Sequence, residues 1–283
     1  MVRHALRYEL IALSRNRRRV VFTLAFPLLL LVVLTATAGS STTTTGGAEV
    51  PLKQFFLPGI VAMSVLSGCF ASVVMVVVTR RESGVTRRRE LTPATRGTLV
   101  AALVLATAAL AVAAAAFLVL VAKVAFGVGV SAAGLALMAV TVVLGAFSLA
   151  ALAFLVARRV PTSDGAQPVV QLVMFPVMFL SGIWFPADQL PRGLEAVANA
   201  IPLKPLVDAL RQEALHGSVA VGHLAVLAAW GIGAGLLASR AQRSKPQGPL
   251  ATRRVSAASV RKTLGWRGEL SENETVPASA RTT

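Results

Sequence analysis

Charged residues are scarce in this sequence, and six long stretches have none. Only 14% of the 283 residues are charged, against about a quarter in an ordinary soluble domain. The uncharged apolar runs cover residues 20–38, 55–79, 97–122, 132–157, 168–185 and 219–239. Each is close to or above the length that crosses a hydrocarbon core of about 30 Å. The pattern excludes a soluble domain and predicts an all-α polytopic membrane protein with six transmembrane helices.

The sequence also lacks the residues that several functions require. A single cysteine, Cys69, excludes a disulfide within the chain, and its apolar surroundings predict a buried core residue. No phosphate-binding G-x-x-x-x-G-K-S/T loop, H-E-x-x-H motif or C-x-x-C pair is present. We therefore expect no catalytic residues, no metal and no nucleotide hydrolysis in this chain. The apolar runs also lack the ionisable residues that ion-coupled transporters usually contain; only Gln171, Ser181 and His223 are polar candidates.

Basic residues are concentrated in alternate connections between the runs. Of the 28 Lys and Arg residues, 23 lie in residues 1–19, 80–96, 158–167 and 240–283. Acidic residues are nearly balanced between the two sets of connections, so the net charge of +16 falls on one face of the membrane. The positive-inside rule makes that face cytoplasmic. We expect both termini in the cytoplasm of a cell with this chain in its plasma membrane, and no nucleic-acid partner.

The N-terminal region has an alternative interpretation as a signal peptide. Residues 1–38 combine a basic start, an apolar stretch and a small-residue "ATAGS" site. Cleavage there would leave five spans and put the basic tail opposite the basic 80–96 connection, so an uncleaved first span is the better interpretation. Before it, residues 1–19 have an apolar stripe at helical spacing and predict an amphipathic helix at the cytoplasmic interface. A merely positive flank is the alternative.

The regions outside the runs complete the predicted organisation. Residues 20–239 form the six-helix transmembrane domain, and residues 240–283 form a basic, disordered cytoplasmic tail. Residues 39–54 are polar and glycine-rich and predict a small external loop. The third and fourth runs are separated by the short "KVAFGVGVS" and predict an antiparallel helical hairpin.

One informative stretch is the basic "TRRESGVTRRRELTPATRG", which covers Thr79 to Gly97. Glu82 is suited to the first turn of a helix, whereas Gly84 would weaken that helix. Pro93 would limit it from the other side. The stretch therefore predicts a short arginine-rich helix of two or three turns that docks on a cytoplasmic partner. An ordinary basic loop that sets topology is the alternative.

The second informative stretch is "FLSGIWFPADQLP", which runs from Phe179 to Pro191. We expect the fifth span to end near Phe185, with Pro186 stopping it and Asp188 capping the next helix. Two short amphipathic helices are predicted at the external surface, and the apolar residues on which this rests are Leu190, Leu194, Val197 and Ile201 for the first, and Leu206, Leu210 and Ala214 for the second. A connector without a further role is the alternative.

These two stretches resemble motifs of one transporter family. The chain is similar to the permease (transmembrane) subunit of type-2 ATP-binding-cassette exporters, in their drug-resistance branch. The "R-E-x-G-T/V" element corresponds to Arg81–Val85, and "F-x-S-G-x-x-F-P-x-x-x-L-P" to Phe179–Pro191. A later "P-L" and "L-R" correspond to Pro202–Leu203 and Leu210–Arg211. The chain departs from the family where relatives show "T-L-x-x-L-R-A-T-P", because it has "VTRRRELTP" instead.

The resemblance implies a function and assigns roles to residues. It implies export of a hydrophobic or amphipathic compound, such as a drug, an antibiotic or a lipid-like molecule. It also implies a second permease copy or paralogue as dimer partner and a separate ATP-binding subunit that holds ATP and Mg. The residues implied in coupling to that ATPase are Arg80, Arg81, Glu82, Gly84, Arg87, Arg88 and Pro93. It further implies that the helices of residues 186–215 form an external re-entrant or gate-lining element. The residues implied in an external gate are Phe179, Ser181, Gly182, Phe185, Pro186, Leu190 and Pro191. An ion-coupled secondary transporter and a membrane enzyme or assembly factor are the alternatives.

Overall fold

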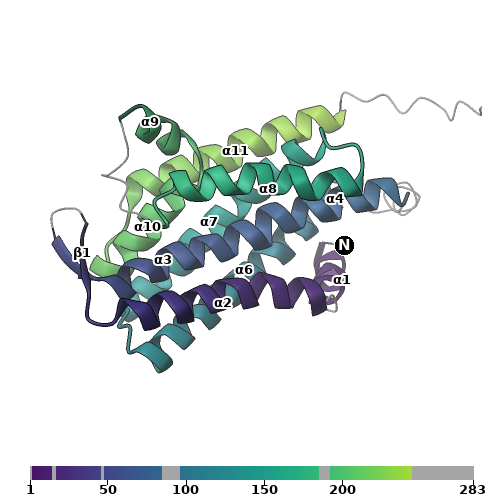
Figure 1. Cartoon of the computed structure of the whole chain (residues 1–283). Helices are drawn as coiled ribbons and strands as arrows, with labels where there is room; N and C mark the ends of the chain where they lie inside the picture. Colours follow the sequence, from purple (N-terminus) through teal and green to yellow (C-terminus); the bar gives the residue numbers. More distant parts are fainter. Residues whose placement is uncertain (1, 15–16, 46–47, 85–95, 185–191, 244–283) are drawn as a thin grey trace, which may run out of the picture. The chain divides into compact units, whose positions relative to one another are not determined.

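The described part of the chain is mostly helical (Figure 1). The structure is a computed structural model that describes residues 2–14, 17–45, 48–84, 96–184 and 192–243. Its helices are α1 (Val2–Ser14), α2 (Arg17–Ala38), α3 (Leu52–Val65), η1 (Leu66–Ala71), α4 (Ser72–Glu82), α6 (Arg96–Phe126), α7 (Ala132–Ala157), α8 (Ser163–Leu180), α9 (Arg192–Ala200), α10 (Leu203–His216) and α11 (Val221–Arg243). Two short strands, β1 (Thr42–Thr45) and β2 (Ala48–Pro51), interrupt the helical pattern.

The helical lengths confirm a polytopic membrane protein. In the part of the chain that the structure describes, three helices are long and apolar enough to cross a membrane: Leu52–Glu82, Gly97–Phe126 and Ala132–Ala157. Two further apolar stretches are shorter, Leu24–Ala38 and Val221–Gly233. Each of the six apolar runs of the sequence overlaps a helix, while the count of six spans stays a prediction.

The helix Leu52–Glu82 lies at the centre of the apolar core. It consists of α3, the π-helical segment η1 and α4, and most of its side chains are buried. A π-helical segment adds a residue to a helical turn, and such segments are frequent at functional sites. Cys69 lies within η1 and is fully buried, as its apolar context predicts. Around it, η1 packs against α6 and α7.

Helices α6 and α7 form the predicted helical hairpin. Gly127 ends α6 with a φ of 64°, a left-handed conformation that glycine adopts without steric cost. The Ser131 hydroxyl then accepts a hydrogen bond from the Gly134 amide at 3.0 Å and caps α7. Small side chains fill the contact between the helices, and Ala106, Ala146 and Ala150 have no exposed surface. Such side chains let helices approach closely in lipid.

The predicted external loop at 39–54 contains a β-hairpin instead. Strands β1 and β2 pair antiparallel, with Thr43 opposite Val50 and Thr44 opposite Glu49. The run of β-branched threonines at 42–45 favours an extended strand. The interpretation of the sequence gave more weight to the glycine-rich composition of this segment and predicted a loop. The hairpin contacts the start of α3.

Helix α8 ends earlier than predicted. The sequence placed the end of the fifth span near Phe185, but α8 stops at Leu180 and begins at Ser163. The break follows from Gly182, whose φ of 72° is left-handed and cannot continue a helix. At its start, the Thr162 hydroxyl accepts from the Gly165 amide at 3.3 Å and caps the helix.

The helices between α8 and α11 differ in burial. Helix α10 packs against α7 and α3, and Leu203, Leu206 and Leu210 are fully buried. The burial of α10 fits the re-entrant form of the element that the resemblance implies, while the position of both helices relative to the membrane stays a prediction. On α9, Leu194 and Val197 of the predicted apolar stripe are exposed. Helix α10 thus inserts among the longer helices while α9 stays outside them.

Candidate functional site

The last turn of α4 is joined to α1 by an ion pair. Arg80 donates from Nη1 to Oε1 of Glu9 at 3.0 Å and from Nη2 to Oε2 at 2.5 Å. The Glu9 side chain is 1% exposed and that of Arg80 is 23% exposed. A guanidinium and a carboxylate joined by two parallel hydrogen bonds form a strong and directional pair. This pair ties the N-terminal helix to the end of the central helix.

The next two residues join α4 to the connection between α7 and α8. Arg81 donates from Nη1 to the carbonyl of Ala157 at 3.3 Å, and from Nη2 to the carbonyls of Val160 and Pro161. Glu82 accepts from the backbone amide of Ser163 at 2.8 Å. The positive side chain meets the negative end of α7, and the negative side chain meets the positive end of α8. Two adjacent residues therefore hold the ends of two other helices.

Gly84 ends α4. Its φ is 70°, its amide donates to the carbonyl of Arg81 at 3.3 Å, and the Ser83 amide donates to Thr79 at 2.9 Å. The prediction that Glu82 lies in the first turn of a separate helix is wrong, because Glu82 is the last residue of α4 and Gly84 lies two residues beyond it. The other predicted coupling residues, Arg87, Arg88 and Pro93, lie outside the described residues.

At the opposite end of the helices, Arg211 of α10 joins three elements. Its Nη2 donates to the carbonyl of Gly182 at 2.9 Å, and its guanidinium carbon lies 4.1 Å from the centre of the Phe55 ring. The side chain is 6% exposed. A guanidinium over an aromatic face is attracted more strongly where water is excluded. Arg211 therefore connects α10 to α3 and to the turn after α8.

The turn after α8 packs closely on α3. The hydroxyl and the amide of Ser181 both donate to the carbonyl of Val177. A Cβ added to Gly59 would lie 3.2 Å from Cγ2 and 3.3 Å from Cα of Ile183, so only glycine fits there without displacement. Phe179, a predicted gate residue, is 58% exposed. The remaining predicted gate residues, Phe185, Pro186, Leu190 and Pro191, lie outside the described residues.

A group of charged side chains links α10 to α9 and α11. Lys204 donates to Oδ1 of Asn199 at 2.7 Å and to Oδ2 of Asp208 at 3.1 Å. The Asp208 carboxylate also lies 3.8 Å from Nη1 of Arg211 and 3.9 Å from Nε2 of His223. Since Lys204 is only 6% exposed, Asp208 compensates a charge that is largely removed from water. Asp208 is therefore the shared acidic partner of this group.

Glu213 of α10 is a buried carboxyl group. Its side chain has no exposed surface, and Oε1 accepts from the Thr141 hydroxyl of α7 at 2.6 Å. Among the described residues, Oε2 has no hydrogen-bond partner and the carboxyl forms no salt bridge. Burial raises the pKa of the Glu213 carboxyl, and the Thr141 hydrogen bond lowers it by a smaller amount. The arrangement favours a neutral carboxyl group.

Two glycines of α7 let α10 approach. A Cβ on Gly145 would lie 2.6 Å from Cδ1 of Leu206, and one on Gly134 would lie 2.5 Å from the carbonyl oxygen of Glu213. Real Cβ atoms do not approach so closely. At Gly134 the neighbour is backbone, so a larger residue would displace α10, whereas at Gly145 the neighbour is the end of the Leu206 side chain, which would have to move. The close packing of α10 on α7 therefore depends most on Gly134.

The sequence interpretation missed three of these residues, and the helical spacing could have found two. Glu213 follows Leu206 and Leu210 at i+7 and i+3, which places it on the buried face of α10. Glu9 follows Leu6 at i+3 and shares the packed side of α1. Arg211 was recognised in the "L-R" pair but was given no role.

The fold and the two ends define a class of protein. The chain is a polytopic helical membrane protein in which charged residues at one end of a central helix hold its neighbours. At the other end, a buried helix is held against the turn that ends α8. Within the part of the chain that the structure describes, no three His, Cys, Asp or Glu side chains form a group that could hold a metal ion.

Comparison with known proteins gives the family. Residues 2–214 match the family model described as ABC-2 type transporter, which is more than half of the chain. The chain therefore belongs to the ABC-2 type transporter family, whose membrane domain contains no ATPase site.

Two nodulation proteins are similar over a short part of the chain. Nodulation protein J of Rhizobium leguminosarum bv. viciae is 34% identical over 73 residues, which cover 26% of this chain and 28% of that protein. Nodulation protein J of Rhizobium leguminosarum bv. trifolii is 35% identical over 68 residues, which cover 24% and 26%. The chain thus spans little more than a quarter of the length of these relatives.

Proposed function

We propose that this chain is the permease subunit of an ATP-binding-cassette exporter. It moves a hydrophobic or amphipathic compound out of the cell, and a separate subunit binds and hydrolyses ATP with Mg. Membership of the ABC-2 type transporter family supports the proposal. The matched relatives carry the name nodulation protein J, which does not indicate a drug as substrate. The proposed substrate is therefore given only as a chemical class, a hydrophobic or amphipathic compound, which the apolar spans favour.

The observation that carries the proposal is the junction at the end of α4. Arg80, Arg81 and Glu82 contact α1, the end of α7 and the start of α8. A force applied to the segment after Gly84 would reach all of these helices together. That segment contains Arg87, Arg88 and Pro93, and we propose it as the site where the ATPase docks. The excess of Lys and Arg on the connections of this end favours a cytoplasmic position.

The gate is proposed at the turn after α8. Phe179, Ser181 and Gly182 precede the segment with Phe185, Pro186, Leu190 and Pro191, and together they would close the external end of the pathway. The contact of Arg211 with the Gly182 carbonyl supports this proposal, because it makes the turn move with α10. Release of that contact would free the turn.

A second permease copy or paralogue would complete the pathway. One face of α8 supports this, because Leu172, Phe175 and Phe179 are 74%, 58% and 58% exposed. Their spacing of three and four residues places them on one side of the helix. We propose that this face lines the pathway between two permeases.

The decisive experiment is transport in reconstituted vesicles. The chain is reconstituted with its ATPase, and ATP-dependent movement of a hydrophobic dye is compared for wild type, Arg81→Ala and Lys123→Ala. The exposed Lys123, at the other end of α6, serves as the matched loss of one positive charge. We expect Arg81→Ala to abolish most transport while insertion is normal. Equal transport without any ATPase would refute the proposal.

An ion-coupled secondary transporter is the second candidate. The buried carboxyl of Glu213 favours it, since such transporters use buried ionisable groups as relays. This candidate predicts transport that an uncoupler abolishes and ATP depletion leaves intact. It also predicts loss of transport in Glu213→Gln, which retains the hydrogen bond but cannot exchange a proton.

A further inference from the structure

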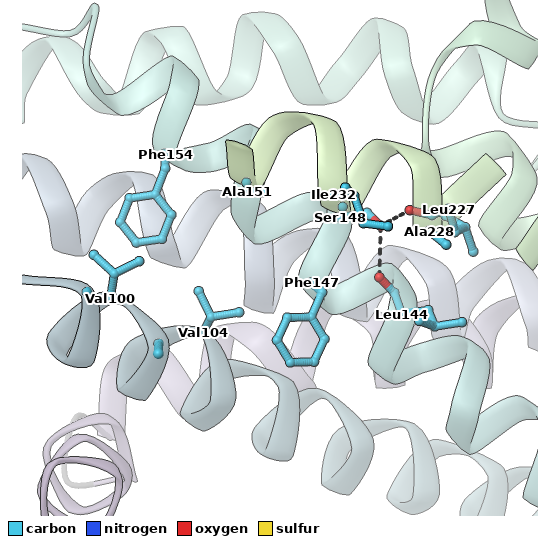
Figure 2. Close-up of a pocket in the computed structure, with 14 residues that line it drawn as sticks. Val100, Val104, Leu144, Phe147, Ser148, Ala151, Phe154, Leu227, Ala228 and Ile232 are labelled. Atoms are coloured by element: carbon cyan, nitrogen blue, oxygen red, sulfur yellow. Dashed lines mark hydrogen bonds between the residues drawn. The ribbon is translucent and has the colours of Figure 1, made fainter. Parts of the chain in front are cut away.

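A large apolar groove lies between α6, α7 and α11. Figure 2 shows that the side chains of Val100, Val104 and Phe154 line one part of it, while Phe147, Leu227 and Ile232 line another. Its volume is about 520 Å³. Phe147 and Ile232 are 36% and 64% exposed, so the groove is open to the surroundings of the helices. It involves none of the residues of the proposed coupling junction or gate.

The described residues of the lining offer no polar group to an occupant. Among them the one polar side chain is Ser148, whose hydroxyl lies within hydrogen-bond distance of the carbonyls of Leu144 and Leu227, at 2.9 and 2.7 Å. A hydroxyl has one proton to donate, and the dashed lines in Figure 2 show that both contacts are internal to the protein. A bound molecule with buried donors or acceptors would leave them unsatisfied. The occupant must be hydrocarbon where it enters the groove.

The length of the groove matches one leaflet of a bilayer. Along α7 the lining runs from Leu144 to Phe154, and ten residues of α-helix rise by about 15 Å. This is half of a hydrocarbon core of about 30 Å. One extended acyl chain of one leaflet would therefore follow the groove from its mouth to its inner end.

All three helices carry arginines at the same end of the groove. Helix α6 begins at Arg96, directly before the lining residue Gly97, and α7 is followed by the exposed Arg158 and Arg159. Helix α11 contains Arg240 after its last lining residue, Gly235. The acidic residues of the described part of this end, among them Glu82 and Asp164, belong to α1, α4 and α8, which do not line the groove.

We propose that the groove binds an acyl chain of an anionic phospholipid, with the phosphate headgroup at the arginines. The apolar lining selects hydrocarbon, the length selects a lipid of one leaflet, and the basic mouth selects a negative headgroup. A neutral cargo compound would gain nothing from the exposed Arg158 and Arg159. This site is separate from the proposed export pathway, and it stands whether or not the chain exports a compound.

The experiment uses the full-length chain purified in detergent and read by native mass spectrometry. Phosphatidylglycerol and phosphatidylcholine with identical acyl chains are titrated separately, without ATP or ATPase. Gly235→Phe fills the groove, since an added Cβ at Gly235 meets nothing within 4 Å. Gly233→Phe is the matched control, because Gly233 is equally open, lies two residues away on α11 and does not line the groove.

The expected result is a loss specific to the groove and to the negative headgroup. Wild type and Gly233→Phe should bind phosphatidylglycerol more tightly than phosphatidylcholine, whereas Gly235→Phe should lose on the order of tenfold in affinity for phosphatidylglycerol. The double variant Arg158→Gln/Arg159→Gln should reduce the preference between the two lipids and leave phosphatidylcholine binding unchanged. Ala151→Phe fills the same groove and replaces Gly235→Phe if that variant does not fold.

Three results would overturn the proposal. The first is that both groove-filled variants bind phosphatidylglycerol with the same affinity as Gly233→Phe. The second is equal wild-type affinity for the two lipids. The third is loss of a dimer in the groove-filled variants with lipid binding unchanged, which would assign the groove to a second copy of the chain.

Discussion

The two ends of the helices use charged residues in opposite ways. At the end of α4, Arg81 and Glu82 are exposed and meet the backbone ends of α7 and α8. Around α10, Lys204 and Arg211 are 6% exposed and Glu213 is fully buried. Removing a charge that is exposed to water changes the free energy of unfolding little. Removing one partner of a buried charged pair leaves the other charge without compensation. Substitutions around α10 should therefore act on stability, and those of Arg81 and Glu82 chiefly on transport.

The largest loss of stability is expected at Arg211. Arg211→Ala removes the hydrogen bond to the Gly182 carbonyl and the contact with the Phe55 ring. We expect the free energy of unfolding to fall by about 3 kcal/mol, because a charged hydrogen bond and a desolvated cation–π contact are lost together. Arg211→Lys should lose less, since it retains the charge but not the planar group. Thermal unfolding in detergent measures both.

Lys123→Ala serves as the control for Arg211→Ala. Lys123 is exposed near the end of α6, so its loss should change the melting temperature little. A melting temperature for Arg211→Ala equal to that of Lys123→Ala would show that α10 is not held by this side chain. The contrast between the two ends would then disappear.

The next largest effect concerns the buried pair of Thr141 and Glu213. Thr141→Val removes the hydroxyl that donates to Glu213 Oε1 and should cost about 1–2 kcal/mol, since it leaves a buried acceptor without its donor. Glu213→Gln keeps an acceptor of the same shape and should be nearly neutral at low pH. Chemical denaturation of both variants at one pH gives the comparison.

The pH dependence of Glu213 follows from its raised pKa. The folded state holds the proton more tightly than the unfolded state, whose reference pKa is 4.5. The native state then binds more protons, so the stability that this group contributes is fully present below pH 4.5 and falls as pH rises toward the folded pKa. Wild type should lose stability relative to Glu213→Gln across that window. A constant difference between them would contradict a buried neutral carboxyl.

The sequence predicted the long elements well because their signals are local. The uncharged runs and the turn at Gly127 follow from composition and glycine, and the α6–α7 hairpin forms as expected. The burial of α10 could not be seen in the same way. Its close packing depends on glycine in α7, chiefly Gly134, which lies far from α10 in the sequence and carries no local sign that another helix packs on it. A contact between elements has no local signature.

The same limit explains the candidate site. Arg81 and Glu82 were selected through a resemblance, but their partners are the carbonyl of Ala157 and the amide of Ser163, about eighty residues away. Backbone groups at helix ends carry no residue identity, so the capping of α7 and α8 by α4 was not predictable from motifs. The incorrect prediction of a helix start at Glu82 arose because its backbone partner on α8 was not visible in the sequence.

A smaller loss of stability and a larger loss of transport are expected at Arg81. Arg81→Ala removes hydrogen bonds to the α7–α8 connection, and because the side chain is exposed the loss should be about 1.5 kcal/mol or less. Transport should fall far more than the melting temperature suggests. Glu82→Gln tests the α8 contact in the same assay, and Glu49→Gln at an exposed position of strand β2 is its control. Parallel losses of transport in Glu82→Gln and Glu49→Gln would contradict a special role for this junction.

The smallest effect on stability is expected at Gly84, and here a matched glycine separates strain from coupling. Gly84 and Gly39 have φ angles of 70° and 51°, and an added Cβ meets nothing within 4 Å at either position. Alanine at each should cost about 1 kcal/mol, because only the left-handed backbone is strained. Gly84 lies directly before the proposed docking segment, whereas Gly39 follows α2 at the opposite end. If the two variants melt at the same temperature but only Gly84→Ala loses transport, the loss is due to transmission through α4. Equal transport in the two variants would place the coupling elsewhere.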